Sequence, residues 1–432
     1  MKTKTLFLIA VLSASLFLIA CPSSEGPNGG TAGASDEIPL GEFSSLTGTT
    51  ATFGQSTHNG IVLALDEINA AGGVNGRKIH LYTEDDQSKP EEAASVVQKL
   101  ISQNNVVAVL GEVASSRSLA AAPICQSNKV PMLSPSSTNP QVTQVGDYIF
   151  RACFIDSYQG DALARFVANT LKLKKAAILT DVKNDYSVGL ASFFKQSFTK
   201  LGGTIVAEQS YSEGDSDFKG QLTSIKGAKP DVLFIPGYYT EVGQIAIQAR
   251  DLGLNQPLVG GDGWESPKLT DIGGKSLNGS YYANHYSPDD PKPAVQKFVE
   301  KYKERFGAAP DSIAALSYDS TYMMIDAMKR AAKIDGPSIR DQLAATTGFQ
   351  GVTGTVSFGP DRNPIKDLVI IAVKDGQKTK FLDMPPPGSE SAAAPAAGSS
   401  PAPMTGTATG TGATPMGSAT PMGSATPMGS PQ

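Results

Sequence analysis

Short apolar runs alternate with amphipathic segments through the middle of the chain, between residues 37 and 384. In the first amphipathic segment, Ile61, Leu65 and Ile68 recur at i, i+4 and i+7, which is the spacing of one helix face. Pro90 suits the first position of another helix, because the N–H that proline lacks would have no partner there. The apolar runs that predict strands are Ile38–Phe43, Lys78–Glu84, Val106–Leu110, Val130–Leu133, Ala176–Thr180, Thr204–Ala207, Asp231–Pro236 and Leu258–Val259.

This alternation of strands and helices predicts an α/β fold with parallel sheets, because parallel strands need a crossover that a helix supplies. The 348 residues from 37 to 384 exceed the size of one ordinary doubly wound domain. We therefore expect two doubly wound lobes with a ligand cleft between them.

The first 21 residues have the pattern of an export signal. Lys2 and Lys4 precede the apolar stretch Leu6–Ala20, whose 15 residues fall short of the roughly 20 that span a membrane. The stretch ends in Leu18-Ile19-Ala20-Cys21, which resembles the lipobox of bacterial lipoproteins. That resemblance implies cleavage before Cys21 and attachment of lipid to it. The alternative is an ordinary secretory signal with an incidental cysteine.

Two further segments have the composition of disordered chain. Residues 21–36 are polar and rich in glycine, and 42 of the 48 residues in 385–432 are Pro, Gly, Ser, Thr or Ala. Three copies of ATPMGS close the chain, and only methionine could fill the interior of a β-helix with that period. Because neither segment can bury enough apolar surface to offset its ordering entropy, we expect a flexible tether and a disordered tail.

Composition and charge exclude some classes of function. Lys and Arg number 36 and Asp and Glu 41, so the formal charge is −5, and removing Lys2 and Lys4 makes it 34 − 41 = −7. No dense basic block is present, which argues against a nucleic-acid partner. Three Cys and three His are too scattered for a zinc site, so we expect no metal and no cofactor. Cys125 and Cys153 could pair or remain free thiols.

Signatures of catalysis are missing or incomplete. The sequence has no GxSxG and no HExxH, and His58, His80 and His285 share no motif. SxxK occurs at Ser192–Lys195 and Ser197–Lys200 without SDN or KTG partners, so an exposed helix surface is favoured over a Ser–Lys hydrolase. The acidic run Glu84-Asp85-Asp86 lacks further cation ligands, which favours a solvated turn. We expect that the protein is not an enzyme.

Three loops follow predicted strands at the sheet edge where open α/β folds bind ligands. The first places Ser115 and Ser116 at the start of a helix, where free N–H groups favour a carboxylate, although serine also caps helices without any ligand. The second, Ser134–Pro140, gathers hydroxyl groups between prolines. The third, Gly260–Trp264, holds Asp262 between glycines, which suits a carboxylate that binds a cation but also a surface turn.

In this order the loops resemble the type-I periplasmic binding proteins for leucine, isoleucine and valine, which are the binding components of ABC transporters. The resemblance covers about 348 residues. Further segments that carry it are Phe43–Gly48, Asp66–Gly76, Tyr148–Arg151 and Gly237-Tyr238.

The resemblance implies roles for individual residues. Ser115, Thr138 and the backbone at Ser136 would hold the α-carboxylate of an amino acid, and Asp262 its α-ammonium. Aromatic residues would line the pocket, with Val113 and Ala114 near the ligand side chain; these residues are Phe53, Tyr186 and Tyr238. Phe53 stands for a tyrosine of the leucine-binding members, Asp262 for a glutamate and Trp264 for a smaller residue, so Trp264 enters the predicted site and the choice of amino acid stays open.

The resemblance also implies three crossovers, near 154–157, 283–287 and 358–362, and cleft closure on the ligand. The expected organisation is a signal peptide (1–20), a lipidated Cys21 with its tether (21–36), an N-terminal lobe (37–155 and 286–359), a C-terminal lobe (156–285 and 360–384) and a tail (385–432). We expect a lipid-anchored, extracytoplasmic monomer that delivers an amino acid to a membrane permease. A sensor of the same fold for an amide, urea or an aromatic acid is the alternative.

Overall fold

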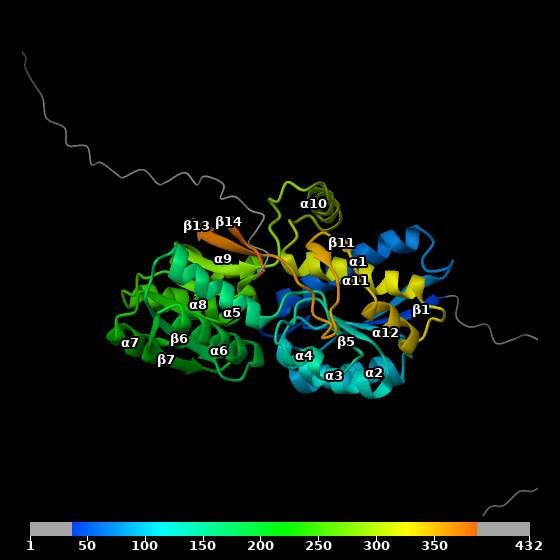
Figure 1. Cartoon of the computed structure of the whole chain (residues 1–432), viewed down its shortest axis with the longest axis horizontal. Coiled ribbons are helices and arrows are strands. Elements are labelled where there is room, and N and C mark those ends of the chain that lie inside the picture. The colour runs from blue at the N-terminus through cyan, green and yellow to red at the C-terminus, as the bar shows by residue number, and fades with distance from the viewer. Residues whose placement is uncertain (1–36, 387–432) are drawn as a thin grey trace, which may run out of the picture. The chain divides into compact units, whose positions relative to one another are not determined.

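The computed structural model describes residues 37–386, which form two α/β lobes that lie side by side (Figure 1). The predictions of a signal peptide, of lipid on Cys21 and of a tether lie outside these residues, as does the predicted tail apart from Pro385 and Pro386. Each lobe is built on one large sheet, which confirms the predicted class of two doubly wound lobes.

The first lobe contains a parallel sheet with the strand order β2-β1-β3-β4-β5. Its strands are β1 (Glu37–Ser44), β2 (Lys78–Asp85), β3 (Val109–Leu110), β4 (Met132–Ser134) and β5 (Ile149–Arg151). Its helices are α1 (Ala51–Ala70), α2 (Pro90–Ser102), α3 (Ser115–Asn128), α4 (Gln141–Gln144), α10 (Pro293–Phe306), α11 (Ser312–Arg330) and α12 (Gly336–Ala344), and β11 (Phe349–Gly351) pairs with β12 (Gly354–Val356).

Neighbouring residues on the central strands of this sheet pack under different helices. Leu110 and Leu133 belong to the core with α1 and α11, whereas Val109 and Met132 belong to the core with α2 and α3. Successive side chains of a strand point to opposite faces, so a continuously apolar run such as 106–110 can fill both cores. The regular strand within that run is shorter than predicted, at Val109–Leu110.

The second lobe contains a seven-stranded sheet with the order β14-β13-β10-β9-β8-β6-β7. Its strands are β6 (Lys175–Asp181), β7 (Thr204–Tyr211), β8 (Val232–Ile235), β9 (Leu258–Gly260), β10 (Ser280–Asn284), β13 (Leu368–Lys374) and β14 (Gln377–Met384). Its helices are α5 (Asp156–Arg165), the π-helical η1 (Phe166–Thr170), α6 (Asp185–Lys200), α7 (Lys219–Ala228), α8 (Tyr239–Asp251), the 3-10 turn η2 (Asp262–Trp264), α9 (Pro267–Gly273) and the 3-10 turn η3 (Gly274–Leu277).

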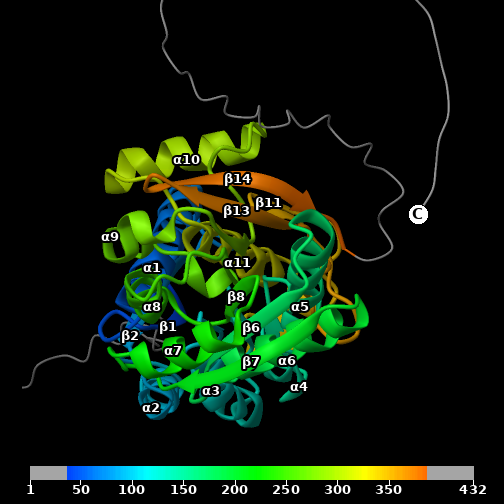
Figure 2. The ribbon, with the colours of Figure 1, turned by 90° about the vertical axis from the view of Figure 1, so that its left-hand side faces the viewer.

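One edge of the second sheet departs from the purely parallel prediction. The hairpin β13–β14 is antiparallel and joins the sheet against β10, at the edge opposite β7 (Figure 2). The tight turn at Asp375-Gly376 has both residues at positive φ, a backbone conformation that suits short hairpin loops. Because the two strands follow each other directly, no crossover helix is needed between them.

The chain passes between the two lobes three times, in the segments 152–155, 285–292 and 357–367. Cys125 and Cys153, for which both states remained open, are buried free thiols. The prediction of a solvated turn at residues 84–86 is wrong for Asp86, because Asp86 is buried and accepts a hydrogen bond of 2.6 Å from the Ser45 hydroxyl. Burial and the nearby carboxylate of Glu112 raise the pKa of Asp86 to about 8.

Candidate ligand-binding site

Residues from both lobes surround a small cavity at the edge where the strands of each sheet end. The cavity has a volume of about 10 Å³, room for about one water molecule, so an amino acid can enter only if the lobes or side chains move apart. Its lining residues are Phe53, Val113, Ser136, Thr138, Tyr186, Tyr238, Asp262, Gly263 and Ile313. Seven of the residues predicted from the sequence are therefore brought together: Phe53, Val113, Ser136, Thr138, Tyr186, Tyr238 and Asp262.

Asp262 begins the 3-10 turn that follows β9 and is held by the side chains of Gln159 on α5 and His285 in the second crossover. Its Oδ1 accepts a hydrogen bond of 2.9 Å from Gln159 Nε2, and its backbone N–H donates to Gln159 Oε1 at 2.8 Å. Its Oδ2 lies 3.0 Å from His285 Nε2. These contacts fix the direction of the carboxylate toward the cavity.

The surroundings of two titratable neighbours of Asp262 favour their neutral forms. Burial lowers the pKa of His285, whose ring stacks on Phe154 with centroids 3.8 Å apart. Burial and the nearby Asp262 raise the pKa of Asp156 well above its usual range. One carboxyl oxygen of Asp156 has no hydrogen-bond partner, although the Thr138 hydroxyl bonds the group. Asp262 therefore has no cationic partner among these neighbours, which suits a positively charged ligand group.

Hydrogen bonds from buried side chains fix the hydroxyl-rich loop between β4 and α4. Arg151 is fully buried and donates to the backbone oxygens of Ser137 and Asn139. Ser134 and Ser137 both donate to the carbonyl of Glu112, at 2.6 and 2.8 Å. This leaves the loop positions of Ser136 and Thr138 facing the cavity.

Ser115 is the first residue of α3 and does not cap it. The N-cap position is Ala114, which offers no side-chain hydrogen bond, so the reading of Ser115 as a simple cap is not what the structure shows. The Ser115 hydroxyl accepts a hydrogen bond of 3.2 Å from the backbone of Asn139, and Ser115 is buried outside the residues that line the cavity. The uncapped N–H groups of α3 retain the ability to bind an anion.

An aromatic cluster forms the apolar wall of the cavity. Tyr186 and Tyr238 stack with centroids 5.4 Å apart, and the Phe53 ring meets Tyr238 edge-on at 5.3 Å. Burial raises the pKa of both tyrosines well above the usual range, so their hydroxyls remain donors. Gly263 is required beneath them, because a Cβ there would lie 2.8 Å from the Tyr238 ring and 2.9 Å from that of Tyr186.

Trp264, predicted as a ligand contact, does not reach the cavity. Its side chain is fully buried within the second lobe, where the indole Nε1 donates to the carbonyl of Ile235 at 2.9 Å. It packs so closely on Gly260 that a Cβ there would lie 2.0 Å from the indole ring. The 3-10 turn directs Asp262 and Trp264 to different sides, which the sequence spacing alone did not reveal.

Ala114 borders a neighbouring space between the lobes instead of the small cavity. This space measures about 320 Å³ and is shared with Tyr238, Ser116 and Arg117. Hydrogen bonds join the lobes around it: the Ser116 hydroxyl accepts from the backbone N–H of Asp185 at 2.9 Å, and Arg117 lies 3.4 Å from Glu213. These contacts hold the lobes in a closed arrangement.

Gln159 and His285 are site residues that the sequence did not identify. Both lie close to predicted crossovers, which pass the cleft by necessity, and a polar residue next to a crossover is the signal that could have identified them. The contact between Gln159 and Asp262 spans 103 residues, so no local pattern reveals it.

The described residues 37–386 offer no support for catalysis at the SxxK motifs. Ser192 and Lys195 are exposed on α6 and line none of the cavities described above. Within the same range, no three His, Cys, Asp or Glu side chains gather as metal ligands would. None of the helices described is both long and apolar enough to span a membrane.

Two lobes that close on a cavity, with a charged group on one lobe and hydroxyls on the other, define a two-lobed solute-binding protein. The family model described as periplasmic binding protein matches residues 37–378, and the chain belongs to that family. This confirms the resemblance predicted from the sequence. Members of this family bind ligands without transforming them, so the prediction that the chain is not an enzyme is also confirmed.

Similar proteins cover nearly the full length of both lobes. A Leu/Ile/Val-binding protein homologue of Brucella abortus is 30% identical over 370 residues, which are 85% of this chain and 98% of the relative. The crystal structure of the leucine-binding protein LivK from Thermotoga maritima is 38% identical with a TM-score of 0.78, covering 81% of this chain and 99% of that one. LivJ from Streptococcus pneumoniae, solved with isoleucine, is 35% identical with a TM-score of 0.76, covering 80% and 100%.

Proposed function

We propose that this protein captures a free amino acid, branched-chain or similar, and delivers it to an ABC importer. The observation that carries the proposal is the meeting of Asp262 from the second lobe with Ser136 and Thr138 from the first, around one cavity. A carboxylate that faces hydroxyls across an apolar wall suits an ammonium group joined to an aliphatic side chain. The names of the similar proteins, which include leucine and isoleucine binders, agree with this chemistry.

In this proposal the α-ammonium binds Asp262 and the α-carboxylate binds near the start of α3. Thr138 and the neutral Asp156 supply further hydrogen bonds to the ligand's polar end. The side chain lies against Phe53, Val113 and Ile313, which are apolar and buried. Trp264 has no part in recognition.

Ligand binding favours the closed arrangement because the two ends of the site belong to different lobes. A ligand that contacts both lobes binds the closed form more tightly than the open one and shifts the equilibrium toward closure. We propose that a membrane permease recognises this closed form, and that lipid on Cys21 keeps the protein, as a monomer, at the outer side of a bacterial membrane.

A thermal-shift screen tests the ligand. The purified protein is heated with each of the twenty amino acids, with small amides and urea, and with aromatic acids. A true ligand raises the free energy of unfolding by RT ln(1 + [L]/Kd), so the melting temperature rises with ligand concentration. We expect the largest shifts from leucine, isoleucine, valine or an amino acid of similar size.

The other outcomes of the screen discriminate between the alternatives. A shift with amides, urea or aromatic acids and none with amino acids would favour the sensor function. Lipid attachment is tested separately: a Cys21→Ala variant should leave the membrane fraction of expressing cells, while amino-acid binding stays unchanged. If that variant remains with the membranes, Cys21 is not the anchor.

A further inference from the structure

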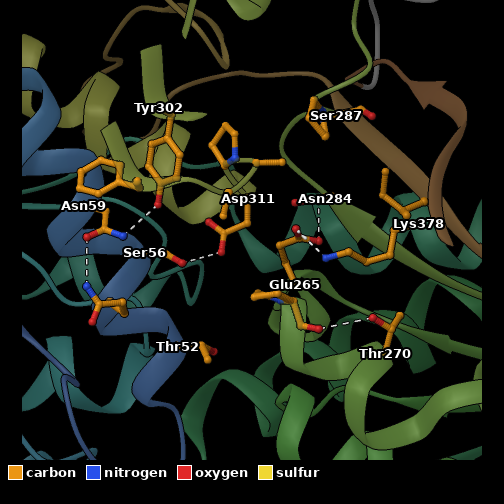
Figure 3. A pocket seen from close by; sticks show the side chains of 18 of the residues that line it. Thr52, Ser56, Asn59, Glu265, Thr270, Asn284, Ser287, Tyr302, Asp311 and Lys378 are labelled. Carbon is orange, nitrogen blue, oxygen red and sulfur yellow. Dashed lines mark hydrogen bonds and ion pairs between the residues drawn. The ribbon is translucent and has the colours of Figure 1, made fainter. Parts of the chain in front are cut away.

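A second, larger cavity lies on the other side of the turn that carries Asp262. It has a volume of about 420 Å³, within the range of small-molecule sites, and shares no lining residue with the cavity around Asp262 (Figure 3). α1 and the loop before α11 line it from the first lobe, and α9, β10 and β14 line it from the second. The Thr52 and Ser266 hydroxyls, 2.9 Å apart, join the lobes at its border.

Two carboxylates from different lobes enter this cavity. Asp311 accepts hydrogen bonds from the Ser56 hydroxyl at 2.5 Å and from the backbone of Ala314 at 2.8 Å. Glu265 accepts from Tyr282 and from Asn284, the latter at 3.1 Å. Figure 3 shows Asp311 beside Ser56, and Glu265 on the side toward Lys378; Glu265 acts electrostatically on Asp311.

Negative charge exceeds positive charge on the walls of the cavity. Lys378 is the lone lysine or arginine among the described lining residues, and its ammonium lies 3.2 Å from Glu265 Oε1. It also donates to the carbonyl of Ser266 at 3.2 Å, so it is held on the side of the second lobe. Within residues 37–386, no lysine or arginine forms an ion pair with Asp311, and Lys378 acts on it only as a nearby charge. Burial and the repulsion from Glu265 raise the pKa of Asp311 to about 6, so it is mostly ionised at neutral pH.

The wall near Asp311 is apolar and aromatic. Tyr302 and Phe306 meet with centroids 4.7 Å apart, and Pro310 and Ile371 complete the lining. A short carbon chain would bury its surface here, and the aromatic rings can attract a nearby cation through their faces. The cavity thus combines two carboxylates, Asp311 and Glu265, with an apolar and aromatic wall.

We propose that this cavity is a second binding site, which takes a small organic cation: a primary ammonium on a short aliphatic chain. The ammonium lies between Asp311 and Glu265 and offsets the repulsion between them, and the chain packs on Tyr302 and Phe306. Because the carboxylates belong to different lobes, the cation binds the closed arrangement best and stabilises it. The site lies beyond the amino-acid site and does not depend on it.

Isothermal titration calorimetry of the whole protein tests the site with three probes of one size: n-butylammonium, 1-butanol and butyrate at neutral pH. We expect n-butylammonium to bind at least tenfold more tightly than either other probe. Asp311→Asn, which keeps the hydrogen bond that caps α11, should weaken its binding at least tenfold. The matched control is Asp326→Asn on the same helix, a half-exposed partner of Arg330 that should change nothing.

The variant Lys378→Met distinguishes a specific effect on n-butylammonium binding from a loss of binding caused by misfolding. Removing the competing ammonium should tighten n-butylammonium binding severalfold, whereas misfolding can only weaken it. Asp262→Asn should leave the binding unchanged. The proposal is overturned if n-butylammonium does not bind at millimolar concentration, if 1-butanol binds equally well, if Asp311→Asn has no effect, or if Asp262→Asn abolishes binding and so places the cation in the amino-acid site.

Discussion

Two of the interlobe cavities use acidic residues from one short stretch of the chain in opposite ways. Asp262 faces a cavity of about 10 Å³ and is held by Gln159 and by a neutral His285. Glu265, three residues later, faces a cavity of about 420 Å³ and is held by Lys378. In the small cavity the lobes already touch through apolar side chains; in the large one they face each other with like charges.

The difference shows that four consecutive residues can contribute side chains to two cavities and to the hydrophobic core of the second lobe. Asp262 points to the small cavity, Trp264 into the second lobe and Glu265 to the large cavity. A 3-10 turn has three residues per turn, so Asp262 and Trp264 point in different directions within it, whereas Glu265 follows the turn with an extended backbone that directs its side chain away from that of Asp262. Proximity in the sequence is therefore a poor guide to a shared site here, and the predictions that follow test each direction separately.

The largest effect is expected for Asp262→Asn. This variant keeps the shape of the side chain and removes its charge, so amino-acid affinity should fall about 100-fold, or about 2.8 kcal/mol. Calorimetry with the best ligand of the screen measures it. Asp251→Asn, on an exposed position of the same lobe, is the control and should bind as the unmodified protein does. Unchanged affinity in Asp262→Asn would remove the ammonium assignment.

Trp264→Phe separates stability from recognition. The shorter ring leaves a void beside Gly260 and an unpaired carbonyl at Ile235, so the free energy of unfolding should fall by about 2 kcal/mol. Amino-acid affinity should stay within about twofold, because the indole does not line the cavity. Urea denaturation and calorimetry measure the two quantities. A large loss of affinity at unchanged stability would restore Trp264 to the site.

The pH dependence of stability should report the strain on Asp311. Its pKa is raised from 3.8 to about 6 by burial and by Glu265, so the folded protein binds a proton more tightly than the unfolded chain does. The resulting stabilisation is full below pH of about 4 and is lost as the pH rises through about 6. Glu265 and Lys378 are the charged groups that act on Asp311, Ser56 donates a hydrogen bond to it, and the titratable phenols near it are those of Tyr282, Tyr286 and Tyr302.

Asp311→Asn keeps an uncharged side chain at every pH. It should match the unmodified protein near pH 4 and exceed its free energy of unfolding at pH 7 by about 2 kcal/mol, as urea denaturation at both pH values would show. Asp326→Asn, with its exposed carboxyl, should show no such divergence. Parallel curves for Asp311→Asn and the unmodified protein would mean that the large cavity is not strained by charge.

The smallest effect is expected for Thr138→Val. The variant removes a hydroxyl that lines the small cavity and bonds Asp156, so amino-acid affinity should fall about tenfold, or about 1.4 kcal/mol. Calorimetry measures it, and Thr223→Val on the exposed face of α7 is the matched control. An unchanged affinity would limit the polar contacts of the small cavity to Asp262 and the backbone.

The sequence predicted the fold well because the signals of strands and helices are local. Val106–Leu110 and Val130–Leu133 were recognised from apolar runs, although the regular strands within them are shorter. The antiparallel hairpin β13–β14 was missed, because no strand was assigned beyond Leu258–Val259. A local sequence pattern also does not show which strands pair with each other.

Only part of the site was predicted, because only some of its residues belong to a local sequence pattern. Loops after strands pointed to Ser136, Thr138 and Asp262, since those loops meet at one edge of the sheets. Gln159 and His285 escaped notice because their partner is distant in the sequence, and the large cavity escaped because Asp311 and Glu265 belong to no motif and meet only when the lobes pack.

The three crossovers have a consequence for the order in which the protein can fold. The first sheet is complete at Arg151, but α11, which covers one of its faces, begins only at Ser312. The apolar face of α1 and of this sheet therefore stays uncovered until some 160 further residues have been made, and other chains can bind to the uncovered surface. Any fragment of the chain that ends before Ser312 therefore leaves this apolar face uncovered, and it should aggregate more than a fragment that ends after Arg330.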